Sequence, residues 1–303
     1  MEKIFEKNLE KKEKKFPKFK RNSVSPQKQI AIQPRDIEIF KKLAEFRFLD
    51  TRHINLLCPG KGGPRYNQRR LEQLYRRFYI DRPRSQLSYY KTRGDIIYAL
   101  GRKGAEAIYN TVPGVQGKID WQQKNREAKY PFIEHTIMMS DFRVALILAL
   151  KNHPTARLAQ WQQGEELKDK VVLKGKITSI IPDAFFTIHK QDKNKALHFF
   201  LEADRSSMDQ STFFQKMLAY REWYKKGGHR KKFNIDSFRV LTITISEERK
   251  ENMRMRSKKA DAGKGSTMLL FTCEKNYSFE KPETILAPIW QSSLDNIPHS
   301  LLG

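Results

Sequence analysis

The stretch IIPDAFFTIHKQDKNKALHFFLEADR, residues 180–205, shapes the second half of this 303-residue chain. Each end is dense in aliphatic and aromatic residues, and the polar run HKQDKNK between them indicates a turn. We predict two strands, 180–188 and 196–204, that pair as an antiparallel hairpin. Residues equally far from the turn then lie opposite one another, which makes Asp183 the partner of Glu202.

Carboxylates gather at one end of this hairpin. Asp183 and Glu202 are directly opposed, and Asp204 shares the face of Glu202 because side chains alternate along a strand, with Leu201 and Ala203 on the apolar side. A divalent cation or a shared proton would relieve the repulsion. Hard oxygen ligands suit Mg²⁺ or Mn²⁺, which would activate water and stabilise charge on a phosphodiester. We therefore predict that Asp183, Glu202 and Asp204 are metal ligands and catalytic residues.

A second interpretation of the carboxylates stays open. A register shift of one residue would move Asp183 off the shared face. Strand ends also carry acidic residues simply because they meet solvent. The three carboxylates would then be surface residues without chemistry.

The surrounding pattern predicts a mixed α+β domain over residues 133–290, followed by a tail at 291–303. Helical spacing precedes and follows the hairpin, and short β-rich runs flank it. The order is helix, three strands, helix, strand, predicted at 133–151, 157–162, 180–188, 196–204, 207–224 and 238–246. A further helix at 248–255 and a strand at 268–272 follow.

The first half carries a pattern typical of a winged helix-turn-helix domain over residues 31–115. Apolar residues at helical spacing predict a helix from Pro34, and Asp50 or Thr51 would cap a second short helix. A third, arginine-rich helix follows the break CPGKGGP. Then come two strands joined by a long loop and a closing helix, predicted at 79–82, 96–100 and 103–109.

Positive charge is concentrated on the third helix and the hairpin after it. Residues 61–100 contain 10 Lys and Arg against 3 Asp and Glu. Such a module places its third helix in the major groove of duplex DNA, while the wing contacts the backbone. The other interpretation is an ordinary solvated helix face. We predict that DNA is bound by Arg65, Asn67, Arg69, Arg70, Arg76, Arg77, Arg82, Arg84, Lys91 and Arg93.

The composition agrees with a nucleic-acid partner in the cytoplasm. A formal net charge of +25 favours a polyanion. The two cysteines, Cys58 and Cys273, exclude a disulfide framework and suit a reducing compartment. The longest apolar run is too short to cross a bilayer, so no membrane partner is expected. The polar segments 1–30 and 116–132 are predicted to be a disordered basic arm and a linker.

Seven short motifs, in order, give the chain a resemblance to a known family. They are RDIEIFKKLAEFRFLDTRHI, LGRKGAEAIY, EHTIMMSDFRVAL, AQWQQGEEL, IIPDAFF, FFLEADRSS and FQKMLAYREWY. Together they resemble the replication-relaxation family of plasmid and mobile-element proteins over roughly residues 33–250. The second half resembles the PD-(D/E)xK nuclease-like fold, also called restriction-endonuclease-like. The resemblance implies a role in replication and relaxation of plasmid DNA.

The chain departs from the nuclease pattern at one position. That pattern has a lysine two residues after the second acidic residue, where this chain has Asp204. Lys216 on the following helix would supply the ammonium, and we predict it as a fourth catalytic residue. In the alternative interpretation, Lys216 only pairs with Glu202 or Asp204, and the nuclease-like scaffold is not catalytic.

Other motifs are weaker. GKGS at 263–266 lacks the spacing of a phosphate-binding loop. The basic cluster at 225–232 either follows phosphates or is a solvated loop. We expect His135 to be a capping or core residue, and Tyr220 and Trp223 to be core or interface aromatics.

Three functions fit these observations. The first is a DNA-binding protein of a plasmid or mobile element, with the winged helix on duplex DNA and the nuclease-like domain engaging DNA, a replication initiator or a relaxase. The second is a Mg²⁺- or Mn²⁺-dependent nuclease that nicks DNA. The third is a winged-helix transcription regulator whose second domain forms a homodimer.

Overall fold

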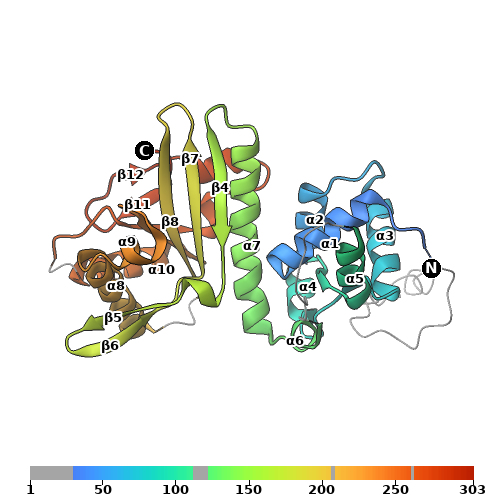
Figure 1. The fold of residues 1–303 in the computed structure, drawn as a ribbon, viewed down its shortest axis with the longest axis horizontal. Helices are drawn as coiled ribbons and strands as arrows, with labels where there is room; N and C mark the ends of the chain where they lie inside the picture. Colours follow the sequence, from blue (N-terminus) through green and yellow to red (C-terminus); the bar gives the residue numbers. More distant parts are fainter. Residues whose placement is uncertain (1–29, 112–121, 206–208, 261–262) are drawn as a thin grey trace, which may run out of the picture. The chain divides into compact units, whose positions relative to one another are not determined.

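The computed structural model forms two compact units (Figure 1). It describes residues 30–111, 122–205, 209–260 and 263–303. Unit 1 comprises Met1–Arg47 and Gly60–Lys129, and unit 2 comprises Phe48–Pro59 and Tyr130–Gly303. The predicted basic arm, except residue 30, and the first part of the predicted linker lie outside the described residues.

Unit 1 combines helices with a small pair of strands. Its elements are α1 (Pro34–Phe46), α3 (Pro64–Arg76), β2 (Ile80–Asp81), α4 (Leu87–Arg93), β3 (Ile97–Leu100), α5 (Arg102–Thr111) and α6 (Gln122–Arg126). Helices α1 and α3 each begin at a proline, which a first helical turn tolerates. Phe40 and Leu43 on α1 and Leu71 and Leu74 on α3 are buried. The helices predicted from Pro34, after CPGKGGP and at 103–109 are confirmed.

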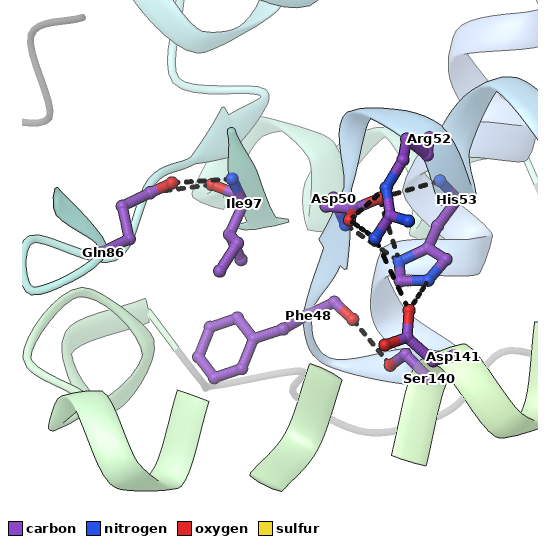
Figure 2. Close-up of polar contacts among 8 residues, drawn as sticks. All are labelled: Phe48, Asp50, Arg52, His53, Gln86, Ile97, Ser140 and Asp141. Atoms are coloured by element: carbon purple, nitrogen blue, oxygen red, sulfur yellow. Dashed lines mark hydrogen bonds and ion pairs between the residues drawn. The ribbon is translucent and has the colours of Figure 1, made fainter. Parts of the chain in front are cut away.

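The prediction that a long loop joins the two strands of unit 1 is wrong. β2 and β3 do pair antiparallel, but the connection contains α4. The side chain of Gln86 accepts a hydrogen bond from the Ile97 N–H (2.6 Å) and donates one to the Ile97 carbonyl (2.9 Å), much as a neighbouring strand would (Figure 2). Helix α4 then buries Tyr89 and ends at Gly94, whose φ of 77° suits a helix C-terminus.

Unit 2 is built on a seven-stranded mixed sheet with helices on both faces. The strand order is β12-β11-β10-β9-β8-β7-β4. Strands β8, β9 and β10 are parallel, and the other neighbours are antiparallel. The sheet strands are β4 (Ala156–Gln162), β7 (Ala184–Lys190), β8 (Lys195–Asp204), β9 (Arg239–Thr244), β10 (Leu269–Cys273), β11 (Trp290–Ser292) and β12 (Pro298–His299).

Unit 2 contains further helices, strands and turns outside the seven-stranded sheet. They are β1 (Leu49–Asp50), α2 (Thr51–Leu57), α7 (Tyr130–Lys151), β5 (Asp169–Leu173), β6 (Lys176–Ile180), α8 (Gln210–Lys225), α9 (Gly228–Phe233), α10 (Glu247–Ala260) and the 3₁₀ turns Glu165–Leu167, Glu274–Asn276 and Pro282–Leu286. Residues 122–126, expected to be linker, form α6, and α7 begins three residues before its predicted start.

The sheet separates two apolar cores because its side chains alternate between faces. On one face Phe142 of α7 contacts Phe186, with ring centroids 5.8 Å apart. On the other face Phe200 lies 6.0 Å from Tyr220 of α8. Leu201 belongs to the α7 side, as predicted. Both faces of the sheet are therefore buried. The interpretation of the three carboxylates as surface residues would instead need this end of the hairpin to face solvent.

The predicted register of the β7–β8 hairpin is confirmed, with Ala184 opposite Leu201. β7 begins four residues later than predicted, because 176–180 forms β6 and pairs with β5 in a separate two-stranded sheet. The β5–β6 hairpin was not predicted, since its strands are short and largely solvated: Ile177 is 74% exposed. Residues expected to be a tail add β11 and β12 to the main sheet and bury Leu301.

Helix α2 belongs to unit 2. The Asp50 carboxylate accepts a hydrogen bond from the His53 N–H (2.9 Å), which confirms the predicted helix cap. His53 Nε2 lies 2.7 Å from Asp141 Oδ1 on α7, and Ser140 Oγ donates to the Phe48 carbonyl at 2.9 Å (Figure 2). These contacts attach to α7 a helix that the sequence pattern grouped with the winged domain.

The prediction of a mixed α+β chain is confirmed, with N-terminal helices and a small sheet followed by a larger mixed sheet. Among the described helices, none is long and apolar enough to cross a membrane.

Candidate functional site

The exposed face of α3 lines a groove on unit 1. Arg65, Arg69 and Arg76 are exposed, and Arg76 keeps 58% of its side chain in solvent while pairing with Glu72 at 2.8 Å. Five arginines and one glutamate lie along the groove, so its charge is strongly positive. The lining consists of Arg65, Gln68, Arg69, Glu72, Gln73, Arg76, Arg77, Arg82 and Ile96.

Three residues predicted to bind DNA are buried: Asn67, Arg70 and Arg82. Arg70 Nε donates to Asp36 Oδ1 at 3.1 Å, and a second guanidinium nitrogen contacts the other carboxylate oxygen. Arg82 pairs with Glu72 and keeps only 2% of its side chain exposed. Arg70 and Arg82 are thus paired inside unit 1, and the sequence pattern did not indicate their burial.

The predicted wing residues Arg84, Lys91 and Arg93 are exposed. Lys91 and Arg93 lie on α4, and the Arg93 guanidinium stands over the Tyr89 ring at 5.5 Å. The groove lining does not include these three residues.

In unit 2 the hairpin brings Asp183 and Glu202 together, as its register requires. Asp183 precedes β7 and is held by the backbone of β8: its N–H donates to the Leu201 carbonyl at 3.1 Å, and its Oδ2 accepts from the Ala203 N–H at 2.8 Å. His135 of α7 reaches the other oxygen, with Nε2 3.3 Å from Asp183 Oδ1. Asp183 is thus held by two elements, β8 and α7.

Helix α8 covers Glu202 with two side chains one turn apart. The Lys216 ammonium contacts Oε2, and the Tyr220 hydroxyl donates to Oε1 at 2.5 Å. Glu202 is only 4% exposed. Both of its oxygens therefore already accept hydrogen bonds inside the protein.

Asp204 takes a different partner. Arg249 of α10 donates from Nε to Oδ2 at 2.8 Å and from Nη2 to Oδ1 at 3.2 Å, a two-pronged pair in which Asp204 is buried and Arg249 is partly buried. The Thr244 hydroxyl lies 3.4 Å from the same carboxylate.

Burial and neighbouring charges set the pKa values in this cluster. Burial raises the pKa of Glu202 to about 7, against the opposing pull of Lys216. Burial also opposes the charges of Lys216, Asp183 and His135, but their partners outweigh it. The pKa of Lys216 is raised by Glu202 and Asp183, that of His135 is raised by Asp183, and that of Asp183 is lowered by His135.

The donor set does not fit the predicted cation site. A hard divalent cation needs several free oxygen ligands, whereas Glu202 is bonded at both oxygens and Asp204 is held by Arg249. Within the described ranges, no three His, Cys, Asp or Glu side chains gather where they would hold a metal ion.

Two members of the cluster were missed or undervalued in the sequence. His135 was expected to be a cap or core residue, although it lies in the motif EHTIMMSDF directly upstream of the buried part of α7. Arg249 carried no signal, because it lies among other basic residues on a helix of weak periodicity. Lys216 and Tyr220 share a helix face, and their spacing was the detectable sign of a common contact.

Comparison with known proteins agrees with the motifs. The chain matches none of the curated proteins and none of the solved structures with which it was compared. The model of the replication-relaxation family matches residues 40–236, well over half of the chain, spanning α3 and the Asp183–Glu202 cluster. The chain therefore belongs to the replication-relaxation family.

Proposed function

We propose that this protein binds duplex DNA through the α3 groove and acts in replication or relaxation of plasmid or mobile-element DNA. The observation that carries the proposal is the exposed arginine row of α3. These guanidinium groups stay in solvent, where a phosphate backbone would meet them without unfolding the helix. The family membership supplies the biological context.

The winged helix-turn-helix interpretation assigns distinct roles within unit 1. Helix α3 would be the element that enters the major groove, and α4 with the β2–β3 pair would be the wing. Arg65, Arg69 and Arg76 then supply phosphate or base contacts, whereas Arg70 keeps α3 attached to α1. Of these four arginines, only the first three belong to the proposed surface.

For unit 2 we propose a nuclease-like scaffold that does not cut DNA. The order α7, β4, β7, β8, α8, β9 supports the nuclease-like fold. The engagement of Glu202 by Lys216 and Tyr220, and of Asp204 by Arg249, supports the absence of cleavage. In this proposal unit 2 engages DNA or a partner protein such as a replication initiator or relaxase.

A gel-shift titration with duplex DNA tests the first part. Replacing Arg65, Arg69 and Arg76 together by glutamine is expected to weaken duplex binding about a hundredfold at about 0.1 M salt, because three phosphate contacts are lost. A control with the same charge change replaces Lys41 and Lys42, partly exposed residues of α1, and Arg102, an exposed residue of α5, by glutamine. Equal weakening by both variants would refute a specific α3 surface.

Incubation with supercoiled plasmid tests the second part. The full-length protein with Mg²⁺ or Mn²⁺ is expected to leave the plasmid intact. Nicking that disappears in Glu202→Gln would overturn the scaffold proposal and establish the nuclease alternative. Duplex binding is measured separately, so the two parts fail independently.

A further inference from the structure

A basic cleft lies at the other end of the central strands of unit 2. β8, β9 and β10 run parallel, and their last residues include Glu202 and Asp204. The first residues of β8 and β9 line a cleft of about 520 Å³, together with one face of α8 and the loop before β10. A volume of this size is typical of small-molecule and nucleotide sites. The cleft is thus separate from the carboxylate cluster.

The cleft is positively charged. Lys195, Arg221, Lys225 and Arg239 line it, and none of the described lining residues is a carboxylate. Arg221 also donates to the Ala260 carbonyl at 2.5 Å. The wall of the cleft therefore carries an excess of positive charge, which favours a bound anion.

Arg239 is the strongest indication of a ligand. It is partly buried at the start of β9, and in the described part of the chain its side chain makes no hydrogen bond or ion pair. Its pKa is lowered because burial removes water without supplying a counter-charge. A partly desolvated guanidinium without a partner is costly, and a phosphate would satisfy it in two-pronged fashion.

An aromatic wall accompanies the charge. Tyr224 lines the cleft with 40% of its surface exposed. Its ring stacks on His229 with centroids 4.7 Å apart and planes 6° apart, which holds it in place. Nucleic-acid bases stack on such rings when they are not already stacked in a duplex. The hydroxyls of Ser237 and Thr267 add hydrogen-bonding groups for phosphate.

Neighbouring segments extend the same chemistry. Helix α9 directly after α8 carries the basic run Arg230, Lys231 and Lys232. Thr267 belongs to the GKGST segment, which lacks a phosphate-loop pattern but still contributes to the cleft. Both segments were ambiguous in the sequence; of the two, the 263–267 segment contributes to the cleft wall.

We propose that this cleft binds single-stranded DNA, with a phosphate on Arg239 and a base stacked on Tyr224. An acidic peptide would satisfy the cations but would leave the aromatic wall unused. A duplex keeps its bases stacked and has none to offer. The inference goes beyond duplex binding by α3, since it concerns another unit and another form of DNA.

Fluorescence anisotropy with a labelled oligothymidylate of about a dozen nucleotides tests the proposal, because single-strand sites span roughly 4 to 16 nucleotides. Tyr224→Ala is expected to weaken strand binding about tenfold, the usual effect of losing one stacked base. The double variant Lys195→Gln, Lys225→Gln alters only exposed side chains and is expected to weaken it by a similar factor. Arg239→Gln is a third variant for the same anisotropy measurement, and it is also expected to weaken strand binding.

The control is the double variant Lys170→Gln, Lys176→Gln on the β5–β6 hairpin, which is expected to bind the strand normally. The cleft variants should retain duplex binding, while the α3 triple variant should retain strand binding, so the two proposals fail separately. Strand binding that is insensitive to both Tyr224→Ala and the lysine double variant would overturn the inference.

Competitors distinguish the source of the ligand. Unlabelled strand should displace the probe, whereas polyglutamate and thymidine monophosphate should displace it only at far higher concentration. Displacement by polyglutamate as effective as by the strand would assign the cleft to an acidic protein segment. Equally effective thymidine monophosphate would make it a mononucleotide site, and either result would overturn the assignment to single-stranded DNA.

Discussion

Charged side chains are concentrated both on helix α3 and at the ends of β7 and β8. Those on the exposed face of α3 lie in solvent, whereas those at the strand ends are paired inside the protein. On α3, Arg65 and Arg69 extend into solvent along a groove. At the strand ends, Glu202 and Asp204 are each bonded to a cation of a covering helix. Charge available to a ligand is charge that stays in solvent, and the difference separates a binding surface from a buried structural network.

Adjacent residues of α3 sharpen the comparison most strongly. Arg70→Ala would leave Asp36 as a buried, unpaired carboxylate, and we expect a loss of about 3 to 5 kcal/mol in the free energy of unfolding. Arg69→Ala removes an exposed side chain and should change it by less than about 0.5 kcal/mol. Urea denaturation of the two variants measures both. Similar losses would mean that Arg69 is also structural.

Lys216 allows the same test in unit 2. Lys216→Met would leave Glu202 without its cation, and we expect a loss of about 3 kcal/mol above pH 8. The loss should shrink near pH 5, since Glu202 can then take up a proton. Lys225→Met, an exposed lysine on the same helix, is the matched control. A loss that does not change with pH would contradict the pairing.

The wild-type protein should lose stability as the pH rises. Burial raises the pKa of Glu202 to about 7 from an ordinary 4.5, so the folded chain binds this proton more tightly than the unfolded chain. The resulting stability is full below pH 4.5 and is lost as the pH passes about 7, by up to about 3 kcal/mol. His135, whose pKa is also raised, acts in the same direction.

Denaturation midpoints across this pH range, compared with Glu202→Gln, provide the measurement. The variant cannot titrate at this position and should show a flatter profile. Superimposable profiles would mean that Glu202 does not titrate in this range.

The sequence was informative where one face of an element is buried. The turn HKQDKNK and the alternation on both sides set the register that joins Asp183 to Glu202, and the apolar stripe of α3 located that helix. The sequence pattern was not sufficient where the structure depends on a contact between residues that are distant along the chain. The Gln86 side chain bonds to the backbone of Ile97 as a neighbouring strand would, directly before α4 begins. The local sequence pattern does not indicate this contact.

The carboxylate site shows the same limit. Strand alternation correctly placed Glu202 and Asp204 on one face. It could not show that Arg249, which is distant in sequence, would pair with Asp204, or that His135 would contact Asp183. Partners supplied by other helices depend on tertiary packing, and they turn a predicted cation site into a network of internal pairs.

The salt dependence of duplex binding tests the central claim most directly. Binding constants of the wild type and of the variant lacking Arg65, Arg69 and Arg76 are measured across a range of salt concentrations. The account predicts that the variant's slope of log K against log salt is smaller by about 2.7, or about 0.9 for each lost phosphate contact. An unchanged slope would contradict the assignment of the α3 groove as the surface that meets DNA.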